Sequence, residues 1–213
     1  MTTVETSTVT CSFELPAVDL QRVIHNTLIF QKTDDINPIL CGSLLRVREG
    51  ELEFVSTDSY CLGFVPVPGE FSGAGLEGGV FVDDAACKGL LAFAKGATGR
   101  VTVDISSSNY ATHVIASTQF GARQEWSVPV VGTYPRVDNL IPAGPAEPTT
   151  SMAFNPAILA RLAKIWPAKA PKPPTAKTVS AMRFVALGKT TQPYQVIMVD
   201  APEVRVYLMG ARV

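Results

Sequence analysis

The sequence has few of the residues that build reactive centres. Its 213 residues include four cysteines and two histidines, and none of them stands in a Cys-x-x-Cys pair or another metal-ligand spacing. His25 and His113 have no nucleophile or carboxylate at a suitable spacing, and the glycine-rich loops that bind phosphates or dinucleotides are missing. We therefore expect no catalytic residue, no metal ion and no cofactor. Four reduced, mostly buried thiols are typical of a cytosolic protein.

Charge of either sign is also scarce. Lysine and arginine number 18 and aspartate and glutamate 19, so the formal net charge is −1. A protein that holds DNA by bulk charge is usually strongly basic, so any contact with DNA has to come from a local patch. No apolar run is long enough to cross a membrane, and no secretory signal opens the sequence. We expect no membrane partner and a cytoplasmic location.

Apolar residues are plentiful, at 46% of the chain, and their spacing repeats one plan three times. Each repeat unit has a strand, a helix with apolar residues three and four apart, and then two or three strands with alternating apolar residues. The first unit comprises residues 12–15, the helix 17–30, and the strands within 37–47 and 51–64. The second comprises residues 80–82, the helix 85–96, and the strands 100–105, 111–118 and 124–129. The third comprises residues 151–154, a helix capped by Asn155, and the strands 181–187, 194–199 and 204–209.

This repetition, with a period of roughly 70 residues, is a signal at the level of the fold. Because few local connections allow parallel pairing, we predict an α+β fold with antiparallel sheets outside and helices on one inner face. The predicted organisation is a tail at 1–11, a complete domain of two units at 12–142, a linker at 143–150, and a second domain of one unit at 151–213. The Pro- and Lys-rich insertion at 167–178 and the glycine-rich segment 69–79 should be irregular and mobile.

The stretch Glu51–Phe64 is predicted to be a strand, a polar turn at Thr57–Ser59 and a second strand. Leu52 and Phe54 should face the core. Glu51 and Glu53 should face solvent, because side chains alternate in a half-buried sheet.

Four segments carry a resemblance to one protein family. They are Asn37–Leu45 (NPILCGSLL), Gly50–Leu62 with its turn TDSYCL, Tyr134–Pro142 (YPRVDNLIP) and Tyr207–Val213 (YLMGARV). In this order they resemble motifs of the β sliding clamp of bacterial DNA polymerase III. Each motif is weak singly, but together, in the right order, they are fairly specific.

The resemblance implies a DNA-clamp fold and a protein that is not an enzyme. Such a processivity factor forms a homo-oligomeric ring around double-stranded DNA, without reading its sequence, and tethers a DNA polymerase; a clamp loader is a further partner. In the family the helices line the hole. The resemblance therefore directs the basic residues of the predicted helices toward DNA, although they also fit an ordinary solvated helix face. These residues are Arg22, His25, Lys88, Lys95, Arg161 and Lys164.

The resemblance also implies a peptide-binding groove made from segments that are far apart in the sequence. Apolar walls with a methionine floor would suit short peptides that carry leucine or phenylalanine, and an arginine would pair with the peptide's acidic group. Each residue alone also fits a core or edge-strand position. The predicted groove residues are Thr57, Tyr60, Leu62, Pro142, Tyr207, Leu208, Met209 and Arg212.

The sequence departs from the family in ways that leave two alternatives open. Ser59, Tyr60 and Cys61 replace a glycine, a His or Arg and a basic residue, and three units stand where a bacterial clamp has six. A shortened clamp of this kind would suit a bacteriophage. One alternative is a clamp-fold interaction protein that binds host replication proteins without forming a ring. The other is a phage structural β protein with no role on DNA.

Overall fold

The fold is that of a computed structural model, which describes residues 9–33, 36–129, 132–141, 153–175, 181–187 and 193–210. In chain order the helices and strands are β1 (Val9–Pro16), α1 (Ala17–Ile29), the 3-10 helix η1 (Pro38–Cys41), β2 (Gly42–Arg48), β3 (Glu51–Thr57), β4 (Cys61–Pro66), β5 (Phe71–Ala74), β6 (Val80–Asp83), α2 (Asp84–Gly96), β7 (Arg100–Ser107), β8 (Ala111–Thr118), β9 (Arg123–Pro129), the 3-10 helix η2 (Val137–Leu140), α3 (Pro156–Leu162), β10 (Met182–Ala186), β11 (Tyr194–Met198) and β12 (Arg205–Leu208).

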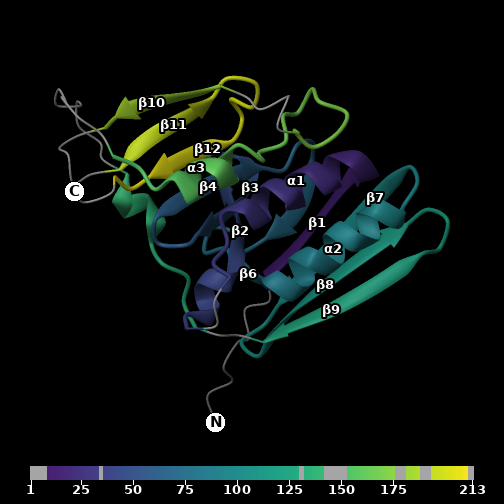
Figure 1. Cartoon of the computed structure of the whole chain (residues 1–213). Helices are drawn as coiled ribbons and strands as arrows, with labels where there is room; N and C mark the ends of the chain where they lie inside the picture. The colour runs from purple at the N-terminus through teal and green to yellow at the C-terminus, as the bar shows by residue number, and fades with distance from the viewer. Residues whose placement is uncertain are drawn as a thin grey trace, which may run out of the picture.

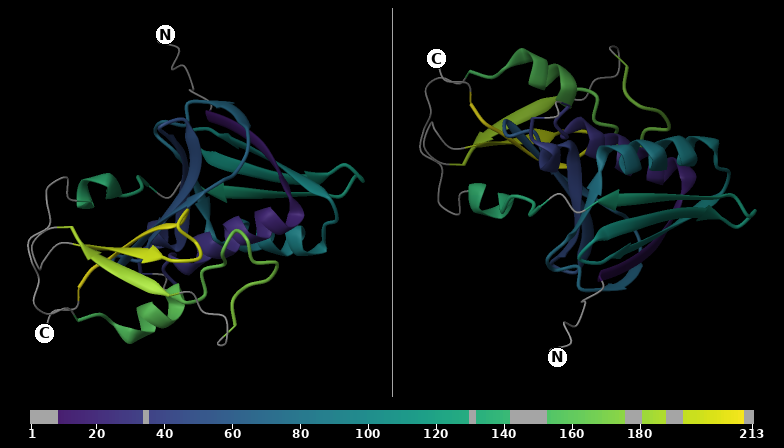
Figure 2. Two further views of the ribbon diagram at one scale, coloured as in Figure 1. Left: turned by 90° about the horizontal axis from the view of Figure 1, so that it is seen from above. Right: turned by 90° about the horizontal axis from the view of Figure 1, so that it is seen from below.

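The strands form two antiparallel sheets, which confirms the predicted α+β fold. Sheet A has the order β5-β1-β7-β8-β9, and sheet B has the order β10-β11-β12-β4-β3-β2-β6. The first two units interlock, because β1 of the first unit pairs with β7 of the second, and β6 of the second pairs with β2 of the first. Helices α1 and α2 pack side by side on one side of the sheets (Figures 1 and 2).

Apolar residues at helical spacing place α1 and α2 against the sheets, as predicted. In α1 the residues Leu20, Val23 and Ile24 are buried, and the Asp83 side chain caps α2 by accepting a hydrogen bond from the Ala86 N–H at 2.8 Å. The Phe30 ring, just after α1, lies over Gly63 of β4, where a Cβ atom would stand only 2.3 Å from the ring. Glycine is therefore required there for close packing.

The third unit joins the sheet of the first unit. Strand β12 pairs with β4, so Tyr207 lies opposite Leu62 and Arg205 opposite Phe64. The buried Asn26 of α1 holds the segment after α3 by donating a hydrogen bond to the Trp166 carbonyl (3.0 Å) and accepting one from the Trp166 N–H (2.7 Å). Strands of the first and third units therefore meet in the middle of one sheet (Figure 1).

Sheet B is buried on both faces near this seam, which corrects the prediction for Glu53. One face packs on the helices. On the other, Val55, Phe64 and Tyr207 form a second core with Tyr134 and Val137 from the segment that carries η2. The Glu53 side chain lies in this second layer, 5% exposed, where Arg46 and Arg205 pair with its carboxylate. The alternation of apolar and polar residues along β3 cannot reveal that a second layer covers its outer face.

Several other predictions need correction. The segment 69–79 contains β5, which pairs with β1, and residues 38–41 form η1 before β2 begins. Helix α3 ends at Leu162, although Ile165 and Trp166 are buried as its predicted face required. Ala153 and Phe154 are irregular.

The insertion is irregular over 167–175, as predicted, but it is anchored to the fold. The Ala168 carbonyl accepts a hydrogen bond from Arg22 (3.1 Å), and the Ala168 N–H donates to Glu203 (3.1 Å). The predicted domain boundaries at 142 and 151 fall outside the described residues and stay a prediction. The same holds for the linker.

Candidate functional site

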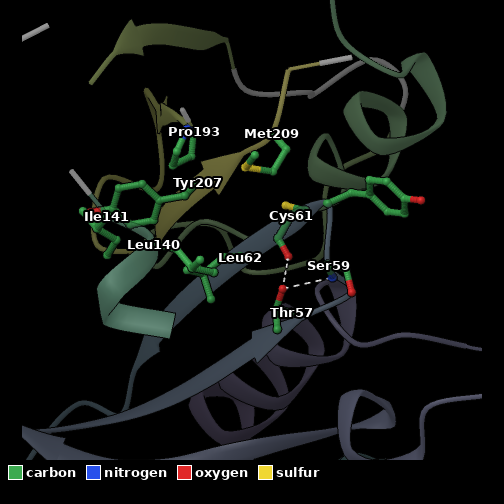
Figure 3. A pocket seen from close by; sticks show the side chains of 10 residues that line it. Thr57, Ser59, Cys61, Leu62, Leu140, Ile141, Pro193, Tyr207 and Met209 are labelled. Carbon is green, nitrogen blue, oxygen red and sulfur yellow. Dashed lines mark hydrogen bonds between the residues drawn. The ribbon is translucent and has the colours of Figure 1, made fainter. Parts of the chain in front are cut away.

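A hollow of about 140 Å³ opens on sheet B at the seam between β4 and β12. Most of its walls are apolar. Figure 3 shows Tyr207, Leu140 and Ile141 gathered on one side and Thr57, Ser59 and Cys61 on the other. The lining residues are Thr57, Ser59, Tyr60, Cys61, Leu62, Leu140, Ile141, Pro193, Tyr207 and Met209. Their side chains come from four segments that are separate in the sequence.

The pairing of β4 with β12 builds the floor and one rim of the hollow. Leu62 and Tyr207 are register partners, so their side chains stand on the same face of the sheet. The Phe64 ring supports Tyr207 from the next position on that face, in an edge-to-face contact with 5.7 Å between ring centroids. Just beyond β12, the Met209 N–H donates to the Tyr60 carbonyl at 2.9 Å. This bond fixes the methionine beside the turn.

The turn from Thr57 to Cys61 is held by its own polar side chains. The Thr57 hydroxyl donates to the Cys61 carbonyl (2.9 Å) and accepts from the Ser59 N–H (3.1 Å). One carboxylate oxygen of Asp58 accepts from the N–H groups of Tyr60 (2.9 Å) and Cys61 (2.7 Å). Ser59 has a φ of 80°, a left-handed conformation that favours glycine. The turn is therefore rigid, and it exposes the Tyr60 ring, which is 64% accessible.

Arg161 braces this turn from α3. Its guanidinium donates to the second carboxylate oxygen of Asp58, and the two side chains are 28% and 10% exposed. Arg161 was predicted to face DNA. Its guanidinium is partly buried and pairs with Asp58, and a role on DNA stays a prediction.

The opposite wall is positioned by a network of charged residues. Arg46 of β2 pairs with both Glu53 and Asp138, and Arg48 donates to the same Asp138 carboxylate at 2.9 Å. The hydrogen bond from Arg46 lowers the pKa of Asp138 below its ordinary value and raises the pKa of Arg46. Because Asp138 lies in η2, this network holds Leu140 and Ile141 at the edge of the hollow.

Five of the predicted groove residues line the hollow: Thr57, Tyr60, Leu62, Tyr207 and Met209. Leu208 does not, and its inclusion was wrong. Side chains alternate along a strand, so Leu208 points away from Tyr207 and is completely buried in the core beneath the helices. Pro142 and Arg212 lie outside the described residues.

Sequence reasoning missed the other five lining residues. Leu140 and Ile141 belong to the segment Tyr134–Pro142 that carried the resemblance, so a signal was present. Cys61 is buried, and burial raises the pKa of its thiol, with the Asp58 carboxylate adding to the rise. The cysteine is therefore an inert part of the wall. No sequence signal pointed to Pro193.

The predicted DNA-facing residues differ in whether their side chains contact other residues of the chain. Lys95 and Lys164 are exposed, and neither has an ion-pair partner within the part of the chain that the structure describes. Both lie near enough to His25 that their charges lower its pKa, together with the larger effect of burial. Lys88 is also exposed and pairs with Asp84 at 2.6 Å, an i, i+4 contact on α2.

His25 and Arg22 also have contacts within the chain. The His25 Nε2 bonds the Lys164 carbonyl at 2.9 Å, and its ring packs edge-on against Trp166. With its pKa lowered by burial, the imidazole is neutral at neutral pH. Arg22 pairs with Asp19 at 2.8 Å, and only 12% of its side chain is exposed. For His25 and Arg22 these contacts oppose a free, DNA-facing charge, and the role on DNA stays a prediction.

No cluster of His, Cys, Asp and Glu that could hold a metal ion occurs among the residues that the structure describes. No described helix is long and apolar enough to span a membrane.

Solved bacterial sliding clamps share this fold. The clamp (DNA polymerase III subunit beta) of Bartonella birtlesii, solved bound to griselimycin, has a TM-score of 0.66 and 20% identity over 95% of this chain and 66% of its own. The β subunit of Thermotoga maritima has a TM-score of 0.66 and 13% identity over 100% of this chain and 68% of its own. The Caulobacter crescentus β subunit has a TM-score of 0.62 and 20% identity, with the same coverage.

The chain therefore has the sliding-clamp fold in a shortened and divergent form. It spans about two thirds of the length of the clamps that it matches. No protein-family model matches the sequence, and no curated protein does. At this level of identity the similarity establishes the fold, and the function has to be argued from the site.

Proposed function

We propose that this chain is a DNA sliding clamp. It forms a homo-oligomeric ring around duplex DNA in the cytoplasm and tethers a replicative DNA polymerase through the hollow, which also receives a clamp loader. The protein catalyses no reaction. It raises the local concentration of the polymerase at the template, which is how tethering increases processivity.

The observation that carries the proposal is the hollow at the seam of β4 and β12. Its apolar floor is open to solvent, and Tyr60, Leu140 and Met209 are exposed at its margin, Met209 at 38%. Exposed apolar side chains around a rigid hollow are typical of a surface that binds a partner. Methionine adapts to different apolar side chains, so the hollow suits a short peptide that inserts leucine or phenylalanine.

The helix surface supports the second part of the proposal. Lys88, Lys95 and Lys164 are exposed on or next to helices that lie on one side of the sheets. Flexible lysines attract phosphate without requiring one geometry. A few such charges on a chain of net charge −1 would hold DNA weakly and in a salt-dependent manner, which permits sliding.

The Bartonella birtlesii clamp was solved with griselimycin bound, and we propose that the hollow of this chain binds the same compound. We expect the full chain to bind griselimycin, and Met209→Ala to weaken the affinity by roughly 10-fold or more, as for a side chain at the centre of a binding site. Isothermal titration calorimetry would measure both. Tyr110→Ala is the matched control, because Tyr110 is 84% exposed and does not line the hollow. Absent binding, or an equal loss in both variants, would contradict the assignment of the hollow.

A clamp-fold protein that binds replication proteins without forming a ring is the second candidate. It is favoured by one observation, that Arg22, His25 and Arg161 are occupied by contacts within the chain. This candidate keeps the hollow and its affinity for griselimycin. It differs in having no preference for circular over linear DNA, so retention on the two DNA forms separates the candidates.

A further inference from the structure

The first two units show how this fold completes a pair of units. Each unit lends its first strand to the other, since β1 pairs with β7 and β6 pairs with β2. In each unit the strand after the helix, β2 or β7, therefore has its outer edge covered by the first strand of the neighbouring unit, β6 or β1. The arrangement is reciprocal, as it would be about a two-fold axis.

Strand β10 holds the same place in the third unit that β7 holds in the second. Each is the first described strand after the helix of its unit and begins an antiparallel run, β7-β8-β9 or β10-β11-β12. β7 lies between β1 and β8, whereas β10 is the last strand of sheet B and pairs only with β11 in the described part of the chain. The position that β1 fills beside β7 has no counterpart beside β10 in those residues.

The register identifies the backbone groups at this edge. The Val199 N–H donates to the Ala181 carbonyl at 3.0 Å, and Met182 lies opposite Met198. Hydrogen-bonded pairs alternate along an antiparallel ladder, so Arg183 and Val185 bond β11. The N–H and carbonyl groups of Met182, Phe184 and Ala186 point to the open edge.

The side chains of β10 are apolar on both faces. Met182 and Phe184 pack toward the main core and Leu187, just beyond the strand, toward the second core. Val185 is half-buried, and Arg183 is the only charged residue of the strand. An apolar edge strand with free backbone groups is a template for pairing unless charge, proline or shortness protects it.

The other sheet edges have such protection. β9 carries Arg123 and Glu125 and ends in Pro129, and most of its residues are exposed. β5 and β6 are only four residues long, and β6 also packs against β8 and β9. Only β10, of the edges in the described chain, combines apolar faces with an unprotected ladder.

We propose that β10 is an interface at which the third unit of a second copy of this chain docks across a two-fold axis. A strand edge is self-complementary in such an arrangement, because every outward donor meets an outward acceptor. The second copy presents the same apolar residues and the same lone arginine, so no acidic partner is needed. The contact differs from the one between the first two units, where the strand after the helix is covered by a first strand, because here β10 of one copy would pair with β10 of the other.

The inference deepens the proposed function but rests on the sheet edge alone. A dimer formed at β10 holds six units, and a ring of twelve units would need two such dimers. The edge contact can exist in a protein that never encircles DNA. Its test therefore uses mass in solution and amide exchange, with no DNA present.

The first experiment compares matched valine-to-lysine variants by sedimentation velocity. We expect the wild-type chain to form dimers or larger even-numbered oligomers. Val185→Lys should abolish this contact at β10 because edge lysines oppose strand pairing, and Ala186→Pro should do the same by removing an outward N–H while the ladder to β11 stays intact. Val18→Lys, at a valine that is 44% exposed on α1, should keep the wild-type mass. Circular dichroism would confirm that the variants fold.

A second measurement does not depend on any variant. Amide hydrogen exchange at Met182, Phe184 and Ala186 should slow with rising protein concentration, because association covers these N–H groups. A wild-type chain that remains a monomer would overturn the proposal. So would an oligomer that persists in Val185→Lys and Ala186→Pro, or exchange at these three amides that is fast at every concentration.

Discussion

The hollow and the helix surface use charged side chains in opposite ways. Around the hollow, each charge is fixed by a partner: Arg161 by Asp58, and Arg46 by Glu53 and Asp138. On the helix surface, Lys95 and Lys164 extend into solvent. Fixed charges position apolar walls within a narrow range of geometry, which a specific partner requires. Free lysines accept many geometries, which suits a surface that slides along phosphates.

Among the fixed charges around the hollow, removal of Arg161 should cause the largest loss of stability. Arg161→Ala leaves the nearly buried Asp58 carboxylate without its cation, so we expect a loss of about 2–3 kcal/mol in the free energy of unfolding. Urea denaturation would measure it. Lys164→Ala is the control three residues away, and its exposed side chain should change stability by less than about 0.5 kcal/mol. Equal losses in the two variants would show that the Asp58–Arg161 pair does not brace the turn.

Removal of the free lysines should act on DNA and leave the fold unchanged. In Lys95→Ala/Lys164→Ala, the slope of log affinity against log salt concentration for duplex DNA should become shallower by about 1.8, or about 0.9 per lost phosphate contact. Fluorescence anisotropy across a salt series gives this slope. Arg22→Ala, whose guanidinium is held by Asp19 and Ala168, should change it much less. The reverse order of effects would mean that the DNA surface has been placed on the wrong residues.

The network at Asp138 predicts a stability that depends on pH. Its carboxyl has a pKa below the ordinary 3.8 because Arg46 and Arg48 favour the charged form. The contribution is therefore complete above pH 3.8 and is lost as the pH falls through the lower folded-state value. Asp138→Asn should cost about 1 kcal/mol at neutral pH, a figure reduced for the partial exposure of Asp138.

The same variant provides its own check. The difference in unfolding free energy between wild type and Asp138→Asn should shrink when both are acidified below pH 3.8. A difference that stays constant with pH would assign the cost to packing and not to the ion pairs.

The smallest expected effect concerns the turn itself. Ser59 adopts a φ of 80°, which costs an L-residue energy that glycine does not pay. Ser59→Gly should raise the melting temperature slightly, through a gain of less than about 1 kcal/mol, because glycine also has more freedom in the unfolded chain. Thermal unfolding followed by circular dichroism would measure it. A destabilisation above that size would mean that the serine side chain contributes to the turn.

Local patterns predicted the helices and most strands because their apolar residues face a single core. The 3.6-residue period located α1 and α2, and alternation located β8 to the residue. β5 was missed because Phe71–Ala74 has no alternation to detect. Glu53 was placed in solvent because nothing in a strand's own sequence reports a second layer packed on its outer face.

The site was predictable in part for a different reason. The resemblance brought together Leu62 and Tyr207, which only the pairing of β4 with β12 makes neighbours. Leu208 could have been excluded from sequence alone, because it is adjacent to Tyr207 in a strand. The contacts of Arg161 with Asp58 and of Arg22 with Ala168 could not, since these residues are more than a hundred positions apart in the sequence.

Retention on circular and linear DNA tests the central claim most directly. The chain would be assembled from dilute solution in the presence of nicked circular duplex DNA, separated from free protein by gel filtration, and then treated with an enzyme that cuts the circle once. A sliding clamp should migrate with the circle at moderate salt and be released when the circle is cut, because it slides off the ends. Equal retention before and after cutting, or equal loss from both DNA forms, would contradict a ring that encircles DNA.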